Sequence, residues 1–238
     1  MSSDNNVDDR LSMLPEEITL HILSLMPTKY AVRTSILSTR WRYRWMFVTN
    51  LDFDDYHPIN GHDMLKNFDM LKKLVNRVLE LWKTPQVELF QLHLSRTWDS
   101  RIVENWIDKA VRLNVRELDI QGLMLSLPLS FFTCKTLTKL RLNNENCHYF
   151  LWKSGCLCPV NLPCLKTLDI VAYSNPFANA FKLIAGCPML ESLSLEVTKC
   201  NSEEDLIQYP NFETTEAIII IYRSCISYKQ SCFKCPKS

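Results

Sequence analysis

One pattern, L-x-x-L-x-L, occurs five times in this chain, with valine or isoleucine also accepted at its apolar positions. The copies are Leu89-Leu92-Leu94, Val115-Leu118-Ile120, Leu137-Leu140-Leu142, Leu165-Leu168-Ile170 and Leu190-Leu193-Leu195. Apolar residues two apart lie on the same face of a β-strand, so each copy predicts one short strand with one buried face. A single strand cannot bury that face alone, and the copies must therefore stack on one another to form a core.

The spacing between copies identifies the kind of repeat. The middle leucines are 26, 22, 28 and 25 residues apart, which is within the range of leucine-rich repeats. Ile102, Trp106 and Ala110 share one helical face and predict a return helix, and a further helix is predicted over residues 177–185. The predicted fold of this part is an α/β leucine-rich-repeat solenoid, a short and irregular horseshoe.

The segment before the repeats, residues 9–45, is rich in apolar residues at helical spacing. Leu14, Ile18, Ile22 and Leu25 predict a helix that begins at Pro15. A second helix is predicted after Pro27, and its large apolar positions are Val32, Ile36, Leu37, Trp41 and Trp45. Fewer than about 40 residues cannot enclose this much apolar surface. We therefore expect the rest of the chain and another protein to cover it.

This segment resembles the F-box of plant F-box/leucine-rich-repeat proteins, with matching elements at residues 9–16, 21–29 and 31–42. Met26 and Arg44 depart from the family's preferences for Phe or Leu and for an apolar residue. The resemblance implies an α-helical module that docks on a Skp-type adaptor, and through it on a cullin. The adaptor-binding positions that it implies are Leu14, Pro15, Ile18, Ile22, Leu23, Val32, Ser35, Leu37, Arg40 and Trp41. Periodicity alone fits an ordinary helical hairpin equally well.

The predicted organisation has five parts. A disordered tail (1–8) precedes the F-box (9–50), a linker with a bridging helix (51–85), the leucine-rich repeats (86–200) and an irregular C-terminal segment (201–238). The β-prone run from Ile218 to Tyr222 predicts either a closing strand or an exposed edge. Further repeats and the FBD region that are often found in the family are not recognised after residue 200, a pattern that fits a truncated or an aberrantly spliced product.

Composition excludes several classes of protein. The formal net charge of +1 argues against a protein that mainly binds a polyanion. No apolar run is long enough to predict a membrane span. The cysteines are scattered among apolar neighbours after a polar N-terminus, which favours reduced thiols and an intracellular location, cytoplasmic or nuclear. Only four glycines are present, so no glycine-rich cofactor loop is predicted, and we expect no cofactor.

Three chemical alternatives are weaker. The five histidines are dispersed and no nucleophile motif accompanies them, so no catalytic residue is predicted. Cys232-x-x-Cys235 has the spacing of half a zinc site but lacks a second pair, and no metal site is predicted. Basic residues between Lys29 and Arg44, interleaved with aromatics, are superficially similar to a nucleic-acid-binding helix. An acidic adaptor surface accounts for the same charges, and no nucleic acid partner is expected.

The residues between the repeat leucines point away from the core and predict a face for a target protein. They are Gln91, His93, Glu117, Asp119, Lys139, Arg141, Thr167, Asp169, Ser192 and Ser194. Their mixed charge favours a protein over a polyanion or a lipid. The predicted function is that of a non-catalytic, substrate-recognition subunit of a Skp–cullin–F-box ubiquitin ligase. The alternatives are a truncated decoy that binds the adaptor without a target, and a repeat scaffold without ligase linkage.

Overall fold

The computed structural model describes residues 13–55, 64–123, 126–144, 159–173, 182–199 and 217–224. Its strands are β1 (Asn50–Asp54), β2 (Leu89–Thr97), β3 (Glu117–Leu123), β4 (Lys139–Asn144), β5 (Thr167–Tyr173), β6 (Ser192–Lys199) and β7 (Ala217–Ser224). Its α-helices are α1 (Glu16–Ser24), α2 (Thr28–Arg33), α3 (Met64–Leu81) and α4 (Ser100–Arg112). Short 3₁₀ helices occupy Thr34–Ile36, Arg44–Phe47 and Leu129–Thr133.

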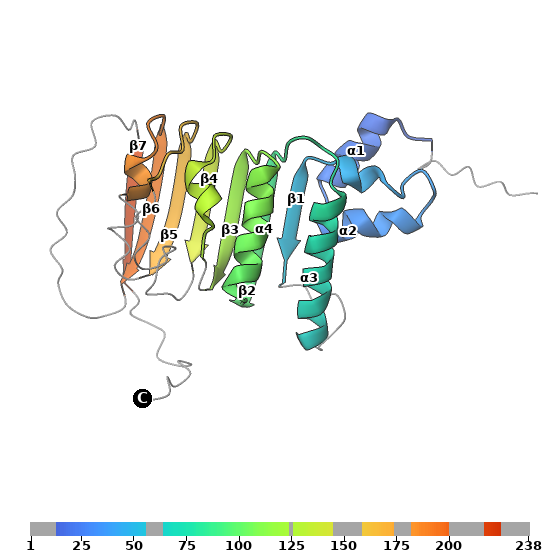
Figure 1. The fold of residues 1–238 in the computed structure, drawn as a ribbon, viewed down its shortest axis with the longest axis horizontal. Coiled ribbons are helices and arrows are strands. Elements are labelled where there is room, and N and C mark those ends of the chain that lie inside the picture. Colours follow the sequence, from blue (N-terminus) through green and yellow to red (C-terminus); the bar gives the residue numbers. More distant parts are fainter. Residues whose placement is uncertain are drawn as a thin grey trace, which may run out of the picture.

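The strands form one parallel, seven-stranded sheet in which they follow one another in sequence order. Figure 1 shows them side by side, with the N-terminal helices beyond β1. The repeat leucines are in register: Leu118 pairs with Leu140, Leu140 with Leu168, and Leu168 with Leu193. Each of the five predicted repeat strands is present. In the last four copies all the predicted apolar residues are buried, and in the first copy Leu92 and Leu94 are buried. The predicted burial of Leu89 is wrong: Leu89 is partly exposed and pairs with Glu117, because Phe90 and Leu92 hold the levels of Leu118 and Ile120.

The sheet extends beyond the predicted repeats at both ends. β1 lies at the start of the segment predicted as a turn-rich linker, and it pairs with β2. Leu51 and Phe53 of β1 are buried, whereas Asp52 and Asp54, which alternate with them, are only partly buried. Such alternation is typical of a strand with one buried face. β7 lies within the segment predicted to be irregular, and it pairs with β6 over its whole length. The remaining residues of 201–238, with Cys232 and Cys235, lie outside the described residues.

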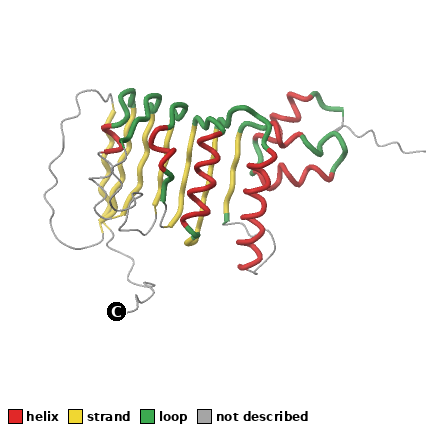
Figure 2. The backbone as a smooth tube through the Cα atoms, viewed as in Figure 1, coloured by secondary structure: helices red, strands yellow, loops and turns green. Residues whose placement is uncertain are grey.

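Helices α3 and α4 cover one face of the sheet at its β1–β3 end, as Figures 1 and 2 show. The predicted bridging helix is α3, whose Val75 and Val78 are buried. Helix α4 buries Trp106 and Ala110 of the face predicted for it and also Val103 and Ile107, whereas Ile102 is only partly buried. These side chains join the strand leucines in a single hydrophobic core. Of the helix predicted over 177–185, residues 182–185 are helical and 177–181 lie outside the described residues.

The N-terminal module is less regular than predicted. Helix α1 begins directly after Pro15, with Glu16 and Glu17 in its first turn, as expected. Helix α2, however, ends at Arg33, and the predicted continuation to Trp45 is wrong. The hydroxyls of Thr34 and Ser35 donate to the carbonyls of Ala31 and Val32, at 2.7 and 2.6 Å. Such bonds compete with the helical backbone pattern, and the chain turns into 3₁₀ helices instead.

The module is joined to the sheet by specific contacts. The buried hydroxyl of Thr28 in α2 accepts a hydrogen bond of 2.8 Å from the Asp52 backbone N–H on the outer edge of β1. Lys29 Nζ lies 3.5 Å from Asp54 Oδ2. The backbone N–H of Lys83, just after α3, donates to the Met46 carbonyl at 3.2 Å. The N-terminal helices therefore cap the first strand and share its core.

We predict that the two faces of a repeat strand respond oppositely to the same charge. Leu168→Asp places a carboxylate in a fully buried position and should cost more than about 4 kcal/mol of unfolding free energy, or prevent folding. Thr167→Asp, the matched control, places the carboxylate on the face of the sheet opposite α3 and α4, beside Lys139, and should change that free energy by less than about 1 kcal/mol. Urea unfolding followed by circular dichroism measures both. Equal losses from the two variants would contradict the register.

Candidate functional site

Two surfaces of the structure are candidate binding surfaces. The first lies on the N-terminal helical module. Large apolar side chains are exposed there, including Ile18 at 47%, Leu37 at 57% and Ile36 at 87% of their maximal accessible area. Met13, Leu25, Met26, Tyr30, Tyr43 and Phe47 are exposed in the same module. Scattered single apolar residues are ordinary at a surface, but this number in about 35 residues marks an interaction site.

The ten predicted adaptor-binding residues divide by exposure. Pro15, Ile18, Leu37 and Arg40 are exposed, and Leu14, Ile22, Val32 and Ser35 are partly exposed. Leu23 and Trp41 are only 1% and 4% exposed, and they pack in the core beside the sheet. These two side chains support the module from inside, and we withdraw them from the predicted docking surface.

Two arginines hold the start of α1 in place. Arg40 Nη2 donates a hydrogen bond of 2.6 Å to the Leu14 carbonyl. Arg44 forms an ion pair with Glu16. The turn between Arg40 and Arg44 is therefore tied to the segment that carries Leu14 and Pro15. Arg40, predicted as a docking residue, also orders the neighbouring part of the surface.

The second surface is the face of the sheet opposite α3 and α4, which we call the open face (Figures 1 and 2). All ten residues predicted for the target-binding face lie on it, because they alternate with buried residues along in-register strands. Glu117, Lys139, Thr167 and Ser192 form one row across the strands, and Gln91, Asp119, Arg141, Asp169 and Ser194 form the next. His93 lies in a third row.

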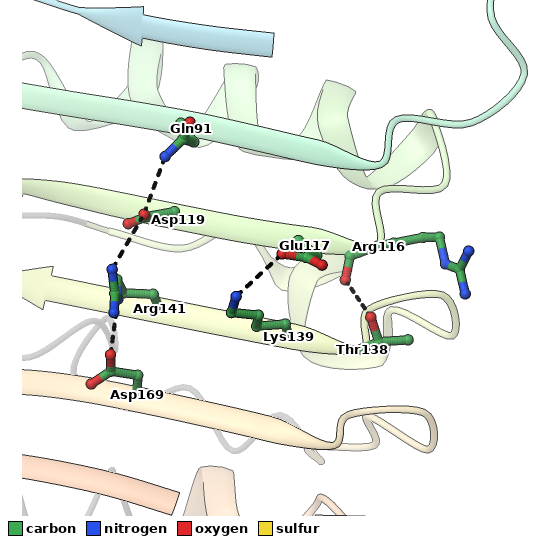
Figure 3. A network of polar contacts seen from close by, with 8 residues as sticks. All are labelled: Gln91, Arg116, Glu117, Asp119, Thr138, Lys139, Arg141 and Asp169. Carbon is green, nitrogen blue, oxygen red and sulfur yellow. Dashed lines mark hydrogen bonds and ion pairs between the residues drawn. The ribbon is translucent and has the colours of Figure 1, made fainter. Parts of the chain in front are cut away.

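Ion pairs between neighbouring strands connect the middle of this face (Figure 3). Arg141 Nε donates to Asp169 Oδ2 at 2.8 Å, and its Nη1 lies 4.0 Å from Asp119 Oδ2. Lys139 Nζ lies 3.4 Å from Glu117 Oε2. Lys139 and Arg141 are thus both paired with carboxylates of the same face.

Sequence reasoning missed the acidic residues that β1 adds to this face. Asp52 lies in the row of Gln91 and Asp119, and Asp54 pairs in register with His93. His93 Nε2 lies 3.4 Å from Asp119 Oδ1, and Gln91 Nε2 donates to Asp119 Oδ2 at 3.4 Å. The alternation of Leu51-Asp52-Phe53-Asp54 was the available signal, but it extends over too few residues to stand out before a turn-rich stretch.

The electrostatics of this corner follow from its geometry. The hydrogen bond with Asp119, together with the charges of Asp119, Asp52 and Asp54, raises the pKa of His93 although burial opposes it. Burial alone would raise the pKa of Asp119, but the hydrogen bonds from His93 and Gln91 hold it below its usual range. Burial and the neighbouring charge of Asp54 raise the pKa of Asp52. Carboxylates are therefore crowded here, and His93 partly compensates them.

The described residues contain no cluster of His, Cys, Asp or Glu arranged to hold a metal ion. Cys187 is buried, and burial raises the pKa of its thiol to about 12, so it is not a reactive thiolate. Within the described ranges, no helix combines the length and the apolar character needed to cross a bilayer.

Comparison with known proteins gives the same two parts. The F-box domain matches residues 11–50, and the leucine-rich repeats of the FBD-associated F-box protein At5g56370 match residues 103–213. The F-box/LRR-repeat protein At3g59200 of Arabidopsis thaliana is 39% identical over 79% of this chain and 36% of its own length. The Arabidopsis F-box/LRR-repeat protein At4g14103 is 36% identical over 79% of this chain and 49% of its own length. The chain thus spans half or less of the length of these relatives.

We predict that His93 stabilises the fold in acid and not in alkali. Because the pKa of His93 is raised in the folded state, its contribution is complete below its unfolded pKa and disappears as the pH rises through its folded pKa. His93→Gln should therefore lower the unfolding free energy by up to about 1 kcal/mol near pH 5.5, and by nothing measurable near pH 9. Urea unfolding at the two pH values measures this. His21→Gln, exposed on α1, should not reproduce the difference.

Proposed function

Because this chain belongs to the plant family of F-box/leucine-rich-repeat proteins, we propose that it is a substrate-recognition subunit of a Skp–cullin–F-box ubiquitin ligase. Proteins that combine these two parts are generally such subunits, and an F-box generally implies a Skp-type adaptor. The observation that carries the proposal is the coexistence of two surfaces. An apolar one lies on the F-box, and a polar one lies on the sheet that the F-box caps.

The apolar surface is proposed to bind the adaptor. Ile18 and Leu37 remain exposed although the same module buries Leu23, Trp41 and Trp45. Burying such side chains against a partner is favourable by about 25 cal/mol for each Å² of apolar area removed from water. The proposed docking residues are Leu14, Pro15, Ile18, Ile22, Val32, Ser35, Leu37 and Arg40.

The polar face is proposed to hold a target protein. We infer that the sheet, its helices and its loops form a leucine-rich-repeat solenoid, whose open face presents one row of side chains after another. The contribution of this subunit to ubiquitin transfer is then positioning, which raises the effective concentration of the target near a charged conjugating enzyme. Members of the family are typically non-catalytic. The proposed location is intracellular, in the cytoplasm or the nucleus.

The junction supports this division of labour. Thr28 of the F-box contacts the backbone of Asp52, and Lys29 contacts the side chain of Asp54. These two aspartates are the residues that β1 contributes to the open face. A target on that face would therefore be held at a defined place relative to the adaptor. A flexible linker would spread the target over many positions and lower its effective concentration.

We predict that charge on the apolar surface abolishes adaptor binding without unfolding the chain. Ile18→Asp combined with Leu37→Asp should weaken binding to a purified plant Skp-type adaptor by at least about a hundredfold, because two apolar anchors become charged at a desolvated interface. Both positions are exposed in the free chain, so the melting temperature should change little. Isothermal titration calorimetry measures the affinity, and circular dichroism measures the melting temperature.

The matched control is Leu129→Asp combined with Met189→Asp. These side chains are similarly exposed, at 61% and 54%, but lie outside the F-box. The control should bind the adaptor as the unmodified chain does. Full affinity of the Ile18 and Leu37 variant would contradict the proposed docking surface, and absence of binding by the unmodified chain would contradict the function.

A further inference from the structure

The open face of the sheet has an uneven charge that the whole chain does not have. Over β1–β6 its three central rows carry Asp52, Asp54, Glu117, Asp119, Asp169 and Glu196 as acids, with Lys139 and Arg141 as permanent cations. The net charge of these rows is −4 when His93 is neutral, whereas the formal charge of the chain is +1. Partners that complement such a face carry positive charge.

The excess negative charge is concentrated at the β1–β3 end. Arg141 and Lys139 lie on β4 and are engaged by Asp169, Asp119 and Glu117. On β1, Lys29 pairs with Asp54 from the side of the F-box. The side chain of Asp52 makes no hydrogen bond or ion pair with any residue that the structure describes, although it is partly buried. Burial and the neighbouring charge of Asp54 raise the pKa of Asp52, and the more distant charges of His93 and Lys29 only partly oppose this rise.

Strand geometry sets the distance between Asp52 and Asp119. The two residues are aligned through Gln91 on the intervening strand, so their backbones are two strand spacings apart, or about 9.6 Å. A guanidinium or ammonium group above Gln91 would lie midway between the two outer strands, offset from each by about 4.8 Å in the plane of the sheet, where the carboxylates that extend from both strands can approach it. His93, in the adjacent row, already supplies part of a positive charge to Asp119.

We propose that the β1–β3 end of the open face binds a basic segment of the target protein, with an arginine or lysine side chain seated between Asp52 and Asp119. This inference rests on the proposed function and names the chemical class of its target. The arriving cation offsets the repulsion between Asp52 and Asp54 and gives the Asp52 carboxylate a direct ion-pair partner, which it does not have among the described residues. The position lies next to the F-box, so the basic segment is the part of the target nearest the adaptor.

The test uses the full chain and a blocked nonapeptide of alternating arginine and serine, with a glutamate–serine nonapeptide as the opposite probe. Isothermal titration calorimetry near neutral pH should detect the arginine peptide and not the glutamate peptide. Asp52→Asn combined with Asp119→Asn should weaken binding by about tenfold, since two carboxylates are lost. Asp69→Asn combined with Glu80→Gln removes the same charge from the exposed side of α3 and should leave the affinity within about twofold.

Asp52→Asn alone keeps the test decisive if the double variant is unstable. Asp52 has no described side-chain partner to lose, so this variant should fold and should weaken binding by about threefold. Equal losses from the α3 control, tighter binding of the glutamate peptide, or no binding of the arginine peptide would each overturn the proposal. Adaptor binding by the same protein sample separates the conclusions: if it persists in these cases, only the basic-target inference fails.

Discussion

The structure depends on the parallel, in-register pairing of successive strands. Leu118, Leu140 and Leu168 occupy one level of the sheet, so each leucine buries its neighbours and is buried by them. A shift of one residue would exchange the two faces and place leucines in water. The same alignment arranges the intervening polar residues in rows on the other side. The core and the candidate binding face are therefore two consequences of a single register.

A stack of this kind leaves an edge strand with unpaired backbone groups, which is a site for unwanted association. The F-box covers this edge at β1, where the Thr28 hydroxyl accepts a hydrogen bond from the Asp52 backbone N–H. Trp41, Trp45 and Met46 extend the core beneath it. The helical module thus has a structural role in the sheet in addition to its exposed apolar surface, and this explains why some of its large residues face inward.

The electrostatic character of the open face also depends on this junction. Without β1, the three central rows of the face over β2–β6 carry a net charge of −2 with His93 neutral, and Arg141 lies between Asp119 and Asp169. The addition of Asp52 and Asp54 makes the end beside the F-box acidic, and the F-box returns only one described cation, Lys29, to that corner. The two halves of the protein therefore create the corner together, and neither would have its charge distribution alone.

The repeat strands, helices α3 and α4, and the polar face were predictable from the sequence, because periodicities of 2 and 3.6 residues follow directly from backbone geometry. So was the start of α1 at Pro15.

Other features depended on contacts between distant segments. The alternation of β1 was too short to be recognised until β2 paired with it. The buried positions of Leu23 and Trp41 depend on how the F-box meets the sheet, and periodicity cannot distinguish a side chain that faces the chain's own core from one that faces a partner. Local sequence determined which residues alternate or recur, and only the tertiary structure decided what each face meets, because burial is a property of surfaces brought together.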